Sequence, residues 1–321
     1  MEKRELNIKD SAIALIISFV ACQLMVLLGQ ILISVTLSFF DYNTSKITNF
    51  LNSPTGCLLA SLFQFFAFIG VFIYYLKKTN LKKVCFANKL NLLQTLIFIA
   101  LDLITMFALN HFISYFCLTL NLFNKPTATF SYELNDAKAY IISLISLAVL
   151  PAIGEELLFR GIIFNGLKQK GTLFAVIVSS LFFSLFHFNL SQLFYPFFFV
   201  LLLGFVYSKT KNITVTILIH FINNAVNLSI QYFSKSNLFK PSIINLILMI
   251  IGAIVFIAIL AYLFITSYKQ QKQINTFTEE NNNQINKSNT SQTKKVLVTT
   301  NDKIVFWAPI IFMIFMYIII V

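Results

Sequence analysis

The chain has 321 residues, of which 58% are hydrophobic and only 11% are charged, and its formal net charge is +12. This composition excludes a soluble domain, because so many apolar side chains could not all be buried in one. Segments in which polar and apolar residues alternate are absent from the sequence, which argues against a membrane β-barrel.

Apolar stretches near the length of a membrane-spanning helix recur from one end of the chain to the other. We therefore predict an all-α polytopic membrane protein, a helical bundle of eight or nine transmembrane helices. The expected spans are residues 12–40, 56–76, 92–120, 139–167, 172–188, 194–208, 213–233, 242–267 and 304–321.

One polar segment interrupts this pattern and divides the chain. Residues 268–303 are rich in Asn, Gln, Ser, Thr and Lys and cannot bury enough apolar surface to fold, so we expect a flexible linker. The predicted division is into N-terminal transmembrane helices (1–137), core helices (138–233), a further transmembrane helix (234–267), the linker (268–303) and a C-terminal apolar helix (304–321).

The positive charges lie on alternate connections between the predicted spans. If the N-terminus is cytoplasmic, the inner segments carry most of the 24 lysines and arginines. This asymmetry is typical of a multi-pass protein of the cell membrane. Membrane topology therefore explains the basic charge, and we expect lipids as partners and no nucleic acid. The lysines between Lys77 and Lys89 also favour attraction to anionic lipid.

The run from Pro151 to Gly161 places Glu155, Glu156 and Arg160 inside an apolar helix. A charged side chain near the centre of a bilayer costs roughly 2.5–3.5 kcal/mol on the insertion scale. Such residues usually mark a buried functional site with identifiable partners.

Helix geometry separates these three charges. Glu156 and Arg160 are four residues apart, share one helix face and can pair. Glu155 points about 100° away around the helix, so it is free for chemistry. Pro151 removes one backbone hydrogen bond, which tends to kink the helix and expose a carbonyl group. The Glu156–Arg160 pair could equally serve only to fix helix packing.

The neighbouring helices bring further polar groups to this region. A short turn at 168–171 makes helices 139–167 and 172–188 antiparallel, so Glu155 and His187 can meet at one depth. Phe183 lies one turn from His187 and shares its face. His220 and Asn224 share a face of helix 213–233. Counting residues places His220 nearer the inner side than His187, a difference that a helix tilt would remove.

This set of residues can perform water chemistry. A buried carboxylate can act as a general base, a histidine can share the proton of a water molecule, and side-chain donors can stabilise an oxyanion. The candidate catalytic residues are Glu155, Glu156, His187, His220 and Asn224.

The three motifs Glu155-Glu156-x-x-x-Arg160, Phe183-x-x-x-His187 and His220-x-x-x-Asn224 occur in this order on consecutive predicted membrane helices. In this respect the sequence resembles the CPBP family, which includes CAAX prenyl endopeptidases and Abi-type bacteriocin-processing proteases. The resemblance implies that Glu155 and His187 activate water and that His220 and Asn224 hold the oxyanion. Glu156, Arg160 and Phe183 would be structural or would orient the substrate.

A metal ion is left open by the sequence. The family has been described both as metalloproteases and as glutamate-dependent hydrolases. Glu155, His187 and His220 could hold zinc with an open water position. However, an H-E-x-x-H motif is absent and Asn224 is a poor zinc ligand, which favours activation of water without a metal.

The leading hypothesis is an intramembrane endopeptidase that cleaves a membrane-associated protein or peptide. The alternative is a non-catalytic protein on the same scaffold, for bacteriocin self-immunity or partner binding. A transporter ranks last, because no repeated halves are visible. A prenylated protein, a peptide pheromone and a bacteriocin leader all remain open as substrates. Asp102 and His111 match no motif, and we expect them to form interhelical hydrogen bonds.

Overall fold

The computed structural model describes residues 3–119, 134, 136–187 and 193–234, with single residues between 247 and 269, and within 111–119 it describes the backbone alone. The described residues form helices, and the only β-structure among them is two isolated bridges, Arg4 with Thr79 and Phe86 with Asn212. The elements are α1 (Ile8–Ser38), α2 (Thr44–Leu51), α3 (Pro54–Lys78), α4 (Leu81–Cys85), α5 (Leu92–Thr119), α6 (Ala137–Leu144), η1 (Ile145–Val149), α7 (Leu150–Glu156), η2 (Leu157–Phe164), α8 (Asn165–Leu167), η3 (Lys168–Lys170), α9 (Thr172–Phe186), α10 (Phe194–Thr210) and α11 (Ile213–Ser234).

The prediction of an all-α multi-pass membrane protein is confirmed, but the count of eight or nine spans is not. Within the described part, five helices are long and apolar enough to cross a membrane. Two more apolar helices, α9 and α10, have only 15 and 17 residues, which is shorter than a typical membrane span. The expected spans 242–267 and 304–321 and the linker 268–303 lie outside the continuously described residues. The five spans are Ile8–Ser38, Pro54–Lys78, Leu92–Asn110, Ala137–Lys170 and Ile213–Phe233.

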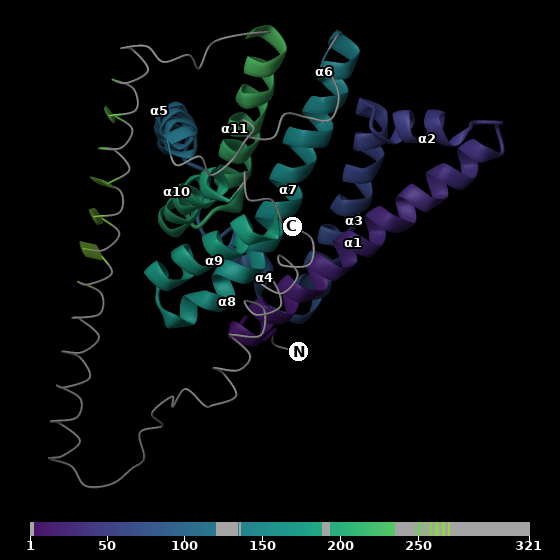
Figure 1. The fold of residues 1–321 in the computed structure, drawn as a ribbon. Coiled ribbons are helices and arrows are strands. Elements are labelled where there is room, and N and C mark those ends of the chain that lie inside the picture. Colours follow the sequence, from purple (N-terminus) through teal and green to yellow (C-terminus); the bar gives the residue numbers. More distant parts are fainter. Residues whose placement is uncertain are drawn as a thin grey trace, which may run out of the picture.

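The continuous helix from α6 to α8 runs through the middle of the bundle. It lies between α1 and α3 on one side and α10 and α11 on the other (Figure 1). The short helix α9 returns antiparallel along η2 and packs on α10, as the turn at 168–171 predicts. The central helix is therefore contacted from several sides, which shields polar groups on it from lipid.

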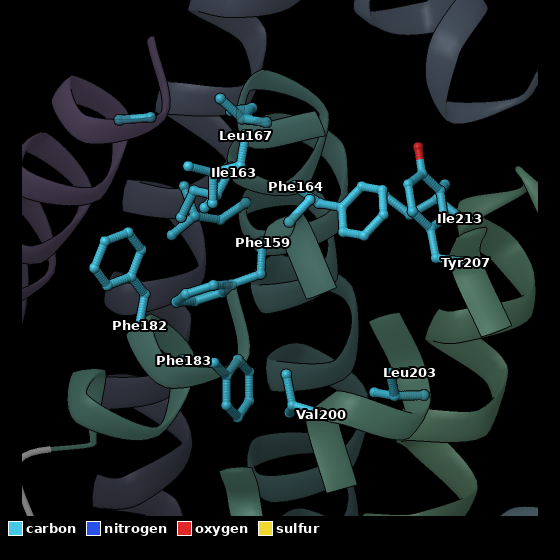
Figure 2. Close-up of a cluster of buried hydrophobic side chains, with 14 of the residues drawn as sticks. Phe159, Ile163, Phe164, Leu167, Phe182, Phe183, Val200, Leu203, Tyr207 and Ile213 are labelled. Carbon is cyan, nitrogen blue, oxygen red and sulfur yellow. The ribbon is translucent and has the colours of Figure 1, made fainter. Parts of the chain in front are cut away.

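Buried aromatic and aliphatic side chains fill the space around η2. Phe159 contacts Phe183 of α9 edge to face, with ring centroids 4.9 Å apart, and Phe164 contacts Tyr207 of α10 in the same way at 5.1 Å (Figure 2). These contacts join the central helix to α9 and to α10. They hold it in a fixed position against both neighbours.

The residues before α1 fold back against one end of the bundle. Asn7 and Asp10 form a capping box that starts α1, and Arg4 pairs with Asp10 at 2.6 Å. The hydroxyl of Ser11 donates to the carbonyl oxygen of Ile163 at 2.9 Å, and Gln169 donates to that of Leu6 at 3.0 Å. Residues 3–7, which we call the N-terminal arm, and the first turn of α1 are therefore hydrogen-bonded to residues 163–169.

The basic connections meet at this same end. Asn80 donates its backbone N–H to the carbonyl oxygen of Arg4 at 3.1 Å, and Ala87 donates to that of Lys211 at 3.0 Å. The segments predicted to face one side of the membrane are thus neighbours in space. Lys46 lies in α2, beyond the opposite end of α1, and Lys138 lies at the start of α6.

Gly166 is the position where the arm comes closest to the central helix. A Cβ atom there would lie 2.5 Å from the carbonyl oxygen of Asn7, which is too close for contact. We expect Gly166→Ala to lower the free energy of unfolding by about 1–3 kcal/mol, because the arm must shift. Thermal unfolding in detergent measures this. Gly70→Ala is the matched control, since a Cβ at Gly70 meets no described atom within 4 Å. Equal stability of the two variants would contradict the proposed packing of the arm.

Candidate active site

The two glutamates lie at the end of α7, between two π-helical segments. In η1 and η2 the backbone hydrogen bonds reach one residue further than in an α-helix, so the turns are wider. Such segments occur frequently at functional sites. The kink predicted at Pro151 stays a prediction, and the structure shows widened turns on both sides of α7.

The carbonyl freed by Pro151 is used by a site residue. Proline has no N–H, so the carbonyl of Leu147, four residues earlier, loses its helical partner. Asn224 of α11 donates its side-chain Nδ2 to this oxygen at 3.2 Å. The exposed carbonyl expected from the sequence is therefore present, and it orients one of the predicted catalytic residues.

Glu156 and Arg160 form the expected ion pair. Oε1 of Glu156 lies 2.8 Å from an Nη atom of Arg160, and both side chains are fully buried. Arg160 also donates to the carbonyl oxygen of Val200 at 3.1 Å and lies over the ring of Phe183. The pair thus connects the central helix to α9 and α10.

His220 lies between the two glutamates. Its Nδ1 is 3.0 Å from Oε1 of Glu156, a hydrogen-bond distance. Its Nε2 is 3.8 Å from Oε2 of Glu155, which is an ion-pair distance but too long for a hydrogen bond. The side chain of Glu155 keeps 14% of its surface exposed, whereas Glu156 keeps none. Glu155 is therefore the less buried of the two carboxylates.

His187 approaches this group from the end of α9. Its Nδ1 is 2.9 Å from the carbonyl oxygen of Phe183, and the two rings lie 5.0 Å apart. Phe183 in turn contacts the ring of His220 edge to face at 5.9 Å. Phe183 thus connects His187 to His220, which lies between the two glutamates.

A second polar network, which the sequence did not predict as a unit, lies beside this group and joins α5, α10 and α11. Asn223 donates to both carboxylate oxygens of Asp102, at 3.3 and 3.2 Å, and accepts a hydrogen bond from Tyr195 at 2.9 Å. The interhelical hydrogen bond expected for Asp102 is confirmed, while the side chain of His111 lies outside the described residues. The Tyr195 ring stacks on Phe199, whose edge contacts His220. The pair Asn223-Asn224 was the available signal in the sequence, and Tyr195 had none.

A preformed metal site is not found among the described residues. They contain no group of three or more His, Cys, Asp or Glu side chains placed to hold a metal ion. The ligand set considered from the sequence, Glu155, His187 and His220, stays a prediction.

The comparisons with known proteins agree with the motifs. Residues 137–226 match the family model described as type II CAAX prenyl endopeptidase, Rce1-like. The curated proteins gave no match to this chain. The matched residues contain every member of the three motifs, and they cover the central helix, α9, α10 and most of α11. Residues 137–226 of this multi-pass membrane protein are therefore similar to Rce1-like CAAX prenyl endopeptidases.

Proposed function

We propose that the protein is an endopeptidase that cleaves a peptide bond of a membrane-associated protein or peptide, with Glu155 as the base that activates water. The observation that carries this proposal is the position of His220 between two carboxylates, of which one is paired with Arg160 and the other keeps 14% of its side-chain surface exposed. The match to a protease family favours this enzyme over the non-catalytic alternative.

The charges of the site balance when His220 is protonated. Arg160 neutralises Glu156, and an imidazolium at His220 neutralises Glu155. A net charge in this buried setting would be costly, because the surroundings solvate it poorly. In this state Nδ1–H donates to Glu156, while Nε2–H has no hydrogen-bond acceptor within reach on Glu155 and is free to donate to a substrate oxygen.

The proposed reaction assigns one role to each of these residues. Glu155 takes a proton from water, and the water oxygen attacks the carbonyl carbon of the scissile bond. The resulting oxyanion accepts hydrogen bonds from Nε2–H of His220 and from the second N–H of the Asn224 amide. The carbon–nitrogen bond then breaks, and Glu155 returns its proton to the leaving amine. His187 holds the water, since its Nδ1 donates to Phe183 and leaves Nε2 as an acceptor.

We place the basic end of the bundle in the cytoplasm, in accordance with the distribution of lysines. The substrate class follows from the membrane setting of the site and from the family description, which names prenylated CAAX sequences. A prenyl or other lipid chain would hold a peptide at the membrane. A bacteriocin leader or a peptide pheromone would also reach the site if it were bound to the bilayer.

A comparison of membrane peptidomes tests the proposed function. Cells that express the wild-type protein should contain peptide termini that are absent from cells expressing Glu155→Gln or His187→Ala at equal membrane levels. Unchanged termini in both variants would remove the peptidase proposal.

Removal of metal ions provides an independent prediction. Because Glu155 and His187 activate water in this proposal, cleavage by the purified protein should keep its rate after dialysis against a strong chelator. Loss of activity with the chelator, restored by zinc alone, would instead establish the ligand set Glu155, His187 and His220. A fluorogenic farnesylated CAAX peptide in nanodiscs is the probe.

A further inference from the structure

A hollow of about 780 Å³ lies beside the basic end of the bundle, away from the candidate active site. Its walls come from two segments, the N-terminal arm and the connection that runs from α3 through α4. The lining residues are Lys3, Glu5, Thr79, Asn80, Lys82, Lys83 and Phe86.

The two walls are bound to each other by hydrogen bonds of the backbone and of one lysine. Asn80 donates to the carbonyl oxygen of Arg4, and Arg4 and Thr79 form an isolated β-bridge. Lys3 donates to the carbonyl oxygen of Leu76 at 2.7 Å, at the end of α3. The hollow is therefore a built feature of the fold and does not depend on chance positions of surface side chains.

The lining carries three lysines and one glutamate, so it is positively charged overall. Among the described residues, the ion pairs involve Arg4, Arg160 and His220 but none of these three lysines. An ammonium group has three donors, and Lys3 uses one of them on Leu76. The three lysines line a space large enough for an anion with several oxygen atoms.

The position of the hollow indicates the source of this anion. It begins where the membrane-spanning helix α3 ends at Lys78, so it lies at the level of lipid headgroups. Phe86 adds an apolar wall and is 49% exposed. A lipid places its phosphate and its glycerol with acyl chains next to each other, which matches lysines beside an aromatic ring. Free inorganic phosphate would make no use of the apolar wall.

We propose that this hollow binds the phosphate headgroup of an anionic phospholipid. The lysines contact the phosphate oxygens, and Phe86 contacts the glycerol and the first carbons of the acyl chains. Basic pockets at the ends of membrane helices are known to select anionic headgroups in this way. The site is separate from the proposed peptidase chemistry and is tested without a protease assay.

Native mass spectrometry with added phosphatidylglycerol measures lipid binding by three variants of the protein in detergent. Lys3→Gln/Lys82→Gln/Lys83→Gln should weaken binding of the first lipid by about tenfold or more. The matched control Lys77→Gln/Lys89→Gln/Lys170→Gln removes the same charge from the same end, outside the hollow, and should bind like the wild type. Lys3→Arg/Lys82→Arg/Lys83→Arg keeps the charge and should retain binding, which separates loss of the site from loss of folding.

Three outcomes would overturn the proposal. If the hollow variant and the control variant lost the same amount of lipid binding, the basic end would attract anionic lipid without a specific site. Equal binding of phosphatidylcholine would show that the anionic charge is not recognised. Displacement of the lipid by inorganic phosphate at millimolar concentration would assign the hollow to free phosphate.

Discussion

Glu155→Gln should lower kcat for peptide cleavage by about 10²–10⁴-fold, because glutamine cannot accept the proton of the attacking water. KM should change little, since the amide has nearly the same shape as the carboxylate and the binding surface is kept. The measurement is steady-state cleavage by purified protein in nanodiscs. The substrates are a farnesylated CAAX peptide and the peptides recovered from the peptidome comparison.

Glu5→Gln provides the matched control for this substitution. It makes the same chemical change at an exposed position in the N-terminal arm, far from α7 in the chain, and should keep wild-type kinetics. If Glu155→Gln kept kcat within about threefold of the wild type, its role as general base would be wrong. A large rise in KM with unchanged kcat would assign Glu155 to substrate binding.

Arg160→Met should lower the free energy of unfolding more than the other single substitutions predicted above. The substitution leaves Glu156 fully buried without its cation, and breaking a buried ion pair in this way costs about 3–5 kcal/mol. The guanidinium also donates to Val200 and lies over Phe183, so packing between three helices weakens as well. Unfolding in a mixed-micelle denaturant series measures the loss.

The double variant Arg160→Met/Glu156→Gln separates charge from packing. Removing both charges should restore a large part of the lost stability, because no unpaired carboxylate is left. Activity should stay low, since Nδ1 of His220 would lose its carboxylate partner. A double variant less stable than Arg160→Met alone would mean that the charge of Glu156 is not the source of the destabilisation.

Much of this site follows from local spacing in the sequence. The four-residue interval between Glu156 and Arg160 predicts their pair, and Pro151 predicts the freed carbonyl that Asn224 binds. Both depend only on the geometry of one helix. The order of the helices and the antiparallel return of α9 follow from apolar length and the short turn at 168–171.

Other features depend on packing between helices and could not be predicted in this way. The spacing predicted that Glu155 points away from Glu156, yet both approach His220, because its ring inserts between them and its two nitrogens face opposite sides. The π-helical turns of η1 and η2 change the rotation and rise per residue, so positions counted on a regular helix shift along the central helix.

The N-terminal arm and the Asp102–Asn223 contact illustrate the same limit. Neither has a periodic signal, since each joins residues more than seventy positions apart in the chain through a few polar atoms. Within the described residues, two of the expected spans are the short helices α9 and α10. Hydropathy recognises apolar segments, but α9 and α10 are apolar because they are buried against neighbouring helices as well as placed in a membrane.

A structure of the Glu155→Gln variant with an uncleaved peptide bound tests the central claim most directly. We predict that the scissile carbonyl oxygen lies about 2.7–3.1 Å from Nε2 of His220 and from Nδ2 of Asn224, with the carbonyl carbon facing Gln at position 155 across one water molecule. A peptide bound with its scissile bond outside this pocket, or with His220 turned away from both position 155 and Glu156, would contradict it.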